Sequence, residues 1–129
     1  MANPESPHKS EYLIFNNTKE YIRFVTDNIV YISADANYSV FHTRDNSTRL
    51  VSIQLGVIEH FYIPEINSEE NDFVRVGRSL IVNLRYLHSV TPSIGQIVLS
   101  DNQSFKYVLS APNEILRDMK NYVELKWKK

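Results

Sequence analysis

Cysteine is absent from the 129-residue sequence, which excludes disulfides, thiolate metal sites and cysteine nucleophiles. Three glycines and five prolines are too few for a collagen-like or proline-rich chain. The opening residues, MANPESPHKSEY, have no basic segment followed by an apolar run and so do not read as a signal peptide. Apolar runs such as IVYI at 29–32 are far too short to cross a bilayer. We therefore expect one soluble, cytoplasmic domain with no membrane partner.

Motifs for catalysis and for cofactor binding are missing as well. The four histidines, at positions 8, 42, 60 and 88, are scattered, and no two have metal-ligand spacing. The sequence contains no P-loop, GxGxxG, GxSxG or HExxH motif. Carboxylates gather at 65–72, where a solvated acidic surface is a simpler interpretation than a catalytic pair. The sequence thus predicts neither an enzyme nor a protein with a cofactor, a metal or a small-molecule substrate.

Charge is nearly balanced over the whole chain but unevenly distributed along it. The net charge is −1 and the isoelectric point is about 6.4, which alone argues against a nucleic-acid partner. Residues 62–72 carry four acidic side chains and no basic one. Residues 73–110 and residues 117–129 each carry an excess of three positive charges. The second half therefore offers basic patches, and the distribution of charge matters more for binding than the total.

Short segments of alternating polarity, typical of β-strands, occupy much of the chain. Three pairs of these segments are each separated by three residues that include an Asp-Asn dipeptide. They are 21–25 with 29–33, 38–43 with 47–51, and 96–100 with 104–108. Because Asp and Asn tolerate left-handed backbone and bond their own chain in turns, we expect three β-hairpins. Residues 1–17 lack periodicity and hold two prolines, so we expect a tail or linker there, before a domain over 18–129.

Two other segments have helical spacing. Over 50–62, five apolar residues share one face: Leu50, Ile53, Val57, Ile58 and Phe61. Over 110–125, Ser110 is a candidate N-cap, Pro112 fits the first turn, and five residues share an apolar face: Ile115, Leu116, Met119, Tyr122 and Val123. The element order lacks the strand–helix alternation of a parallel sheet. It predicts a mainly β fold of antiparallel sheets with two or three short helices.

Polar residues interrupt two stretches that otherwise resemble buried strands. In FVRVGRSLIVNL (73–84), strict alternation would place Arg78 on the apolar face of Val76 and Leu80, where an unpaired arginine is costly. We expect the strand to break near Gly77 and turn Arg78 and Ser79 outward; a bulge with a snorkelling arginine fits the periodicity equally well. In ADANYSV (34–40), Asn37 is either an ordinary turn residue or a side chain free to bond a base edge.

The same stretches resemble the LytTR family of DNA-binding domains. FVRVGRSLIVNL is similar to the family pattern F-x-R-V-H-R-S-x-x-V-N, and DNIVYISADANYSVFHT is similar to its opening, with an I-x-Y-I-x-A-x-x-N-Y core. LVSIQLGVIEHFY resembles the central helix, and IVLSDNQSFKYVLS resembles the late hairpin. The resemblance covers about residues 18–124. The chain departs from the pattern at Gly77, where the family has histidine, and at residues 111–113, where many members are basic.

The resemblance implies an elongated fold of about ten short strands and a sequence-specific transcriptional regulator. Members often carry an N-terminal receiver domain, but only about 17 residues precede the matched stretch here, so we expect a stand-alone domain without one. Such domains reach into successive major grooves of double-stranded DNA through loops, usually on direct repeats, which implies a homodimer on the DNA. The residues expected at this interface are Asn37, Tyr38, Arg75, Arg78, Ser79, Asn83, Lys106, Ser110, Asn113 and Arg117.

Two of these residues have a second interpretation, and so does the whole chain. Asn83 could instead bond local backbone, and Arg75 could pair with the acidic segment. The alternative for the chain is a protein-interaction β-domain that kept the fold and lost strong DNA binding. A regulator should gather Arg78, Lys106 and Arg117 on one face, away from the 65–72 acidic segment, whereas a protein-binding module should show a contiguous apolar patch.

Overall fold

The computed structural model describes residues 11–128, and this part of the chain forms ten strands and three α-helices. In chain order the strands are β1 (Tyr12–Asn16), β2 (Tyr21–Val25), β3 (Ile29–Asp35), β4 (Tyr38–Thr43), β5 (Thr48–Val51), β6 (Phe73–Val76), β7 (Leu80–Asn83), β8 (Leu87–Thr91), β9 (Gln96–Ser100) and β10 (Lys106–Ser110). The helices are α1 (Leu55–Phe61), α2 (Ile63–Ile66) and α3 (Asn113–Lys126). Short 3₁₀ turns cover 26–28, 84–86 and 92–94.

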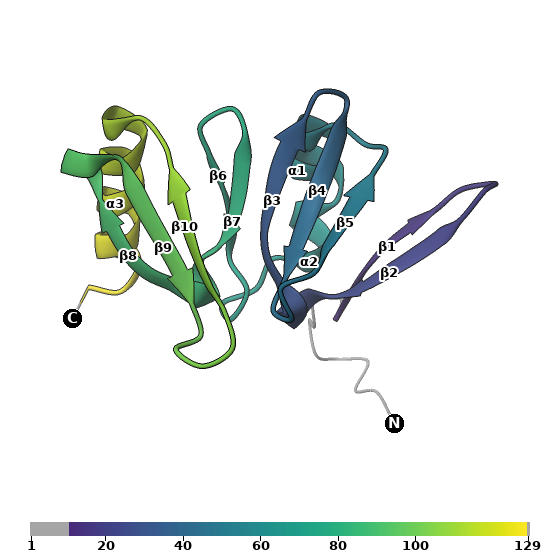
Figure 1. Ribbon diagram of the computed structural model, residues 1–129, viewed down its shortest axis with the longest axis horizontal. Coiled ribbons are helices and arrows are strands. Elements are labelled where there is room, and N and C mark those ends of the chain that lie inside the picture. The colour runs from purple at the N-terminus through teal and green to yellow at the C-terminus, as the bar shows by residue number, and fades with distance from the viewer. Residues whose placement is uncertain (1–10, 129) are drawn as a thin grey trace.

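The strands form three antiparallel sheets. β1 and β2 make a two-stranded hairpin, five strands pair in the order β5-β4-β3-β7-β6, and three pair in the order β10-β9-β8. Figure 1 shows the sheets side by side along the long axis, with the β1–β2 hairpin at one end and α3 at the other. The expected elongated, mainly β fold with antiparallel sheets and short helices is confirmed.

The five-stranded sheet separates two hydrophobic cores. Side chains of a strand alternate between the faces of its sheet, so in β7 Ile81 joins the first core and Val82 the second. The hairpin and the two short helices cover the first core, where Phe24 and Phe41 stack with ring centroids 4.4 Å apart. The three-stranded sheet and α3 cover the second core, around the fully buried Leu116. Both faces of the central sheet are thus closed, which leaves its turns to carry polar residues.

Two of the three predicted hairpins are confirmed, and one is wrong. β4 pairs with β5, and β9 pairs with β10. The segments around 26–28 do not pair with each other, because β2 pairs with β1 and β3 pairs with β4 and β7. At this break Asp27 accepts hydrogen bonds from two distant side chains, Asn71 at its carboxylate and Tyr86 at its carbonyl. The Asp-Asn dipeptide here marks a link between two sheets rather than a hairpin turn.

A tail or linker was expected over residues 1–17, and for residues 12–16 this expectation is wrong, because they form a strand. Tyr12–Asn16 alternates exposed and buried residues as β1, and its Leu13 and Phe15 enter the first core. This five-residue alternation is too short to stand out beside the two prolines of the segment. Residues 1–10 lie outside the described residues. The structured unit therefore begins before residue 18.

The helix boundaries differ from the expected ones. Leu50 pairs in β5 and α1 begins only at Leu55, so of the five residues expected on one face only Ile58 is buried, and Phe61 is 70% exposed. The second helix is confirmed, but Ser110 ends β10 and does not cap the helix, since Pro112 occupies the N-cap position. The helices were expected to begin at residues 50 and 110, but these residues pair in β5 and β10. Each helix therefore begins only after its preceding strand ends.

Candidate nucleic-acid interface

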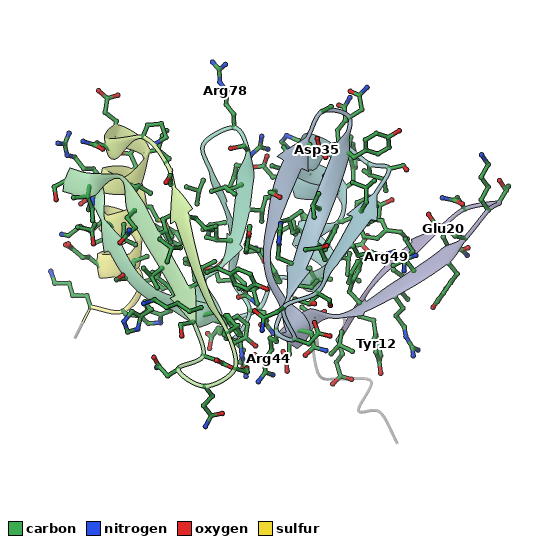
Figure 2. The ribbon with its side chains drawn as sticks, in the orientation of Figure 1. Tyr12, Glu20, Asp35, Arg44, Arg49 and Arg78 are labelled. Atoms are coloured by element: carbon green, nitrogen blue, oxygen red, sulfur yellow. The ribbon has the colours of Figure 1, made fainter. Side chains whose placement is uncertain are left out.

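The stretch FVRVGRSLIVNL forms the β6–β7 hairpin, with Val76 opposite Leu80 and a three-residue turn between them. Gly77 has φ +64°, in the left-handed region that glycine adopts without a Cβ penalty. The strand therefore breaks where the alternation of polar and apolar residues predicts. Arg78 and Ser79 are exposed on the turn, and Figure 2 shows Arg78 pointing away from the molecule at one end.

Arg75 lies in the same hairpin but has a different environment. Its Nε donates to the carbonyl of Gly77 at 3.0 Å, and its Nη2 donates to the carbonyl of Arg78 at 2.8 Å. Its Nη1 lies 2.6 Å from Oε1 of Glu59 on α1. Arg75 thus pairs with an acid, as its second interpretation allowed, but with Glu59 and not with the acidic segment 65–72. Two of its guanidinium nitrogens therefore bond the turn that presents Arg78, and the third ties Arg75 to α1.

The β3–β4 turn lies beside the β6–β7 turn. The amide of Ala34 donates to the carbonyl of Ser79 at 2.9 Å, which continues the β3–β7 pairing into the turns. Ala36 has φ +55°, an uncommon conformation for a residue with a Cβ. Asn37 is exposed, and its Oδ1 accepts a hydrogen bond from Gln54 Nε2 at 3.0 Å. This bond holds the side chain at the tip of the turn, and among residues 11–128 nothing else bonds the side-chain Nδ2 of Asn37, which can therefore donate to a ligand.

A third loop, between β10 and α3, completes this end of the molecule. The amide of Ala111 donates to the carbonyl of Gly95 at 3.1 Å. A Cβ on Gly95 would lie only 2.9 Å from the carbonyl of Ala111, so this close approach requires glycine. A Cβ on Gly77 would lie 3.8 Å from Ile115 in the first turn of α3, which places the third loop near Arg78. We call residues 35–38, 77–79 and 110–113 together the loop end.

Seven of the ten expected interface residues lie at or next to the loop end, and all seven are exposed: Asn37, Tyr38, Arg78, Ser79, Ser110, Asn113 and Arg117. Arg117 follows Asn113 by about one helical turn on α3. Arg75 lies beside the loop end, in its hydrogen-bonded position. Segments far apart in sequence therefore contribute to one polar surface.

Asn83 and Lys106 do not belong to this surface. Asn83 is fully buried; its Nδ2 donates to the carbonyl of Ile29 and to Asn71, and its Oδ1 accepts from the amide of Arg85. The expectation of a DNA contact at Asn83 is therefore wrong, while the expectation that it bonds backbone is confirmed. Lys106 begins β10, whereas the third loop follows the end of that strand. It lies a strand length away from the loop end.

The loop end carries few free positive charges. Arg78 and Arg117 are exposed there, together with the acidic side chains Asp35 and Glu114. The expected gathering of Arg78, Arg117 and Lys106 on one face is wrong for Lys106. The acidic segment 65–72 precedes β6 and lies at the opposite end of that strand from the Gly77 turn, as expected for a regulator. The charge of this surface is thus small and local.

Three contributors to the loop end were missed by sequence reasoning. Gln54 orients Asn37, Glu59 orients Arg75, and Gly95 allows the β10–α3 loop to approach the turn before β9. Gln54 and Glu59 lie in the segment expected to be one continuous helix over 50–62. Nothing in their spacing shows that they would contact Asn37 and Arg75. Gly95 carried a usable signal, because a lone glycine between two strands often marks a close backbone approach.

Two negative findings apply to the described residues. Within 11–128 the structure has no helix long and apolar enough to span a membrane. In the same range there is no group of three or more histidine, aspartate or glutamate side chains that could hold a metal ion.

Comparisons with known proteins agree with the resemblance seen in the sequence. The family model of the LytTr DNA-binding domain matches residues 19–120. Among solved structures, the fold is similar to the LytTr DNA-binding domain of a protein described as a methyl-accepting/DNA response regulator from Bacillus cereus, with a TM-score of 0.57 and 16% sequence identity. The match covers 93% of this chain and 99% of the other. No curated protein matches the chain. On the family match over most of its length, the chain belongs to the LytTR family of DNA-binding domains.

Proposed function

We propose that the chain is a sequence-specific DNA-binding transcriptional regulator that reads the major groove of double-stranded DNA through the loop end. The observation that carries the proposal is the exposed Arg78 in the turn whose sequence resembles the family's characteristic stretch. Within the described residues, the Arg78 guanidinium has no hydrogen-bond or ion-pair partner, so all its donors remain available to a ligand.

Arg78 is suited to read guanine. A planar guanidinium can donate to O6 and N7 of one guanine together, which the single ammonium of lysine cannot imitate. Arg75 donates two hydrogen bonds to carbonyls of the turn and is itself held by Glu59 on α1, so Arg78 is presented on a supported backbone. Asn37 is suited to a second base. Gln54 holds its side-chain Oδ1, and its side-chain Nδ2 can donate to a base edge. Two neighbouring turns would thus supply two different kinds of base contact.

The weak charge of the loop end sets the expected salt dependence. Arg78 and Arg117 are the basic side chains we assign to DNA there. Arg78 is assigned to a base and only Arg117 to phosphate, so the slope of log affinity against log salt should be on the order of −1. Base readout would then account for a larger share of the specific affinity than in a strongly basic domain.

The experiment is a selection on random duplexes, followed by titration of variants against the selected and a scrambled duplex. Arg78→Ala should lose roughly 1–3 kcal/mol on the selected duplex and much less on the scrambled one. Arg78→Lys should restore scrambled-duplex binding without restoring discrimination, and Asn37→Ala should weaken a different base position.

Arg117→Ala is the matched control, because it removes an exposed arginine that we assign to phosphate. It should weaken both duplexes equally. Equal losses on both duplexes for Arg78→Ala would demote Arg78 to a phosphate contact, and loss of melting stability would make it structural.

The assembly on DNA follows from the resemblance alone. We propose that two copies bind direct repeats as a homodimer, inside the cell. Sedimentation of the complex on a duplex with one or two copies of the selected site tests this, since a second copy should bind only where the second repeat is present.

The second candidate is a protein-interaction domain, and the outer face of the β1–β2 hairpin favours it. Tyr12, Ile14, Tyr21 and Val25 are 39–57% exposed and lie on the face of the hairpin that points away from the first core. Such an exposed apolar face is typical of a contact surface. If no duplex binds at low salt, the protein-interaction function is favoured. If the chain binds DNA through the loop end, Tyr21→Ser should leave its DNA affinity unchanged.

A further inference from the structure

Gln54 contacts the β3–β4 turn although it lies 17 residues after Asn37 in the sequence. Its Nε2 donates to Oδ1 of Asn37 at 3.0 Å, and both side chains are exposed. Gln54 is the N-cap residue of α1, but its side chain makes no capping hydrogen bond. Serine, threonine, aspartate and asparagine are the usual capping residues. The helix therefore gives no reason for a glutamine here, whereas the contact with Asn37 does.

The backbones on either side of this hydrogen bond are fixed to each other. Ser39, two residues after Asn37, is fully buried, and its Oγ donates to the carbonyl of Ile53 at 2.6 Å. Ile53 directly precedes Gln54, whose own carbonyl accepts two amides of α1 at 3.1 Å each. The bond between Gln54 and Asn37 therefore has to order only side-chain torsions, which lowers its entropic cost.

The two polar atoms of the Asn37 carboxamide offer opposite chemistry to a ligand. Oδ1 only accepts hydrogen bonds, and Nδ2 only donates them. Gln54 engages Oδ1, and no group among residues 11–128 accepts from Nδ2. Gln54 thus determines that Asn37 presents a donor at the tip of the turn.

A donor in the major groove distinguishes the keto bases from the amino bases. Guanine and thymine present only acceptors among their polar groups there, whereas cytosine presents the N4 donor. Adenine lies between the two classes, because its N6 donates and its N7 accepts. A free asparagine favours adenine by bonding N6 and N7 together, and an asparagine whose oxygen is already engaged loses that advantage.

We infer that Gln54 is a positioning residue that makes Asn37 select guanine or thymine on the strand that it contacts. The inference rests on the proposed function, since it concerns a base read by the loop end. Replacing Gln54 with glutamate should reverse the selection. A carboxylate cannot donate, so it would accept from Nδ2 of Asn37 and leave Oδ1 facing outward, where it can accept from the amino groups of cytosine and adenine.

The test is the selection on random duplexes, repeated with variants of Gln54. The position read by Asn37 is the one whose base preference disappears in Asn37→Ala. There the wild type should prefer guanine or thymine to cytosine roughly fivefold, the effect of one net hydrogen bond. Gln54→Glu should prefer cytosine or adenine by a similar factor, and Gln54→Ala, which frees both polar atoms, should prefer adenine. The guanine read by Arg78 should stay the same in all of them.

The double variant Asn37→Ala with Gln54→Glu is the matched control for added charge. It carries the same extra negative charge as Gln54→Glu, so both should bind every duplex more weakly than the wild type. Only the double variant should show no preference at the Asn37 position, because the reversal acts through Asn37. A reversed preference that persists in the double variant would overturn the inference.

Nuclear magnetic resonance of the free chain tests the arrangement of the two amides without DNA. The temperature dependence of the side-chain amide shifts should show the Gln54 protons bonded and the Asn37 protons free in the wild type, and the Asn37 protons bonded in Gln54→Glu. If a duplex is selected but Gln54→Glu leaves the base at the Asn37 position unchanged, the inference is overturned and the proposed function stands. If no duplex is selected by the wild type, both are overturned.

Discussion

Replacing Arg75 should separate the support of the β6–β7 turn from direct contact with DNA. Arg75→Ala removes three hydrogen bonds, two to the carbonyls of Gly77 and Arg78 and one to Glu59. Hydrogen bonds from a charged donor contribute about 1.5–3 kcal/mol each when buried, but here the Arg75 side chain is 26% exposed and the bonds are not additive. We therefore expect a loss of about 2 kcal/mol in the free energy of unfolding, which lowers Tm by roughly 8 °C.

The effect on DNA should come through the loosened turn. Arg78 would sample more positions, so affinity for the selected duplex should fall roughly tenfold while the slope of log affinity against log salt stays the same. A direct phosphate contact by Arg75 would behave differently, because its loss would reduce the slope by about 0.9. Denaturant unfolding and titrations at several salt concentrations, far below Tm, measure both quantities.

Glu59→Gln is the matched control. It removes the ion pair and leaves the two bonds to the carbonyls, so it should cost about 1 kcal/mol or less and barely change discrimination. If Arg75→Ala lowered the salt slope without lowering stability, the supporting role of Arg75 would be refuted and a phosphate contact would take its place.

Three further outcomes are expected. Asn83→Ala should cost about 3 kcal/mol in denaturant unfolding, because it strands the carbonyl of Ile29 and the side chain of Asn71 in the interior; a change under 1 kcal/mol would contradict this. Burial lowers the pKa of His42, so its contribution to stability is complete above pH about 6.5 and is lost as the pH falls from there towards the folded-state pKa; unfolding measured from pH 5 to 8 should show this loss, and His42→Gln should flatten it. Gly77→Ala should cost about 1 kcal/mol through its positive φ, because the new Cβ meets Ile115 only at ordinary contact distance, and a melting curve identical to that of the wild type would argue against it.

Local patterns predicted a large part of the fold. The turns at 44–46 and 101–103 follow from turn-forming residues between alternating strands, and both hairpins are present. The break at Gly77 follows from the cost of an arginine on an apolar face. These features depend on residues close in sequence, where backbone preference and alternation act together.

Other local patterns were overridden by pairing at long range. The 26–28 break has the same dipeptide as the two real hairpins, yet β2 pairs with β1 and leaves β3 to β4 and β7. Leu50 fits a helical face by spacing, but it pairs with Val40 across the β4–β5 ladder. Hydrophobic spacing cannot reveal which strand a segment will pair with, since that choice is made by contacts far away in sequence.

The sequence by itself determined the family, the mainly β fold and the turn that exposes Arg78. Only the tertiary structure decided which polar residues are free to bind. Arg75 and Arg78 are three residues apart, but Glu59 on another element occupies the first and leaves the second open. Asn83 matches the family pattern but is fully buried, and its side chain donates to the carbonyl of Ile29 in β3. The availability of a side chain depends on partners brought together by folding, and those partners are not encoded in its neighbours along the chain.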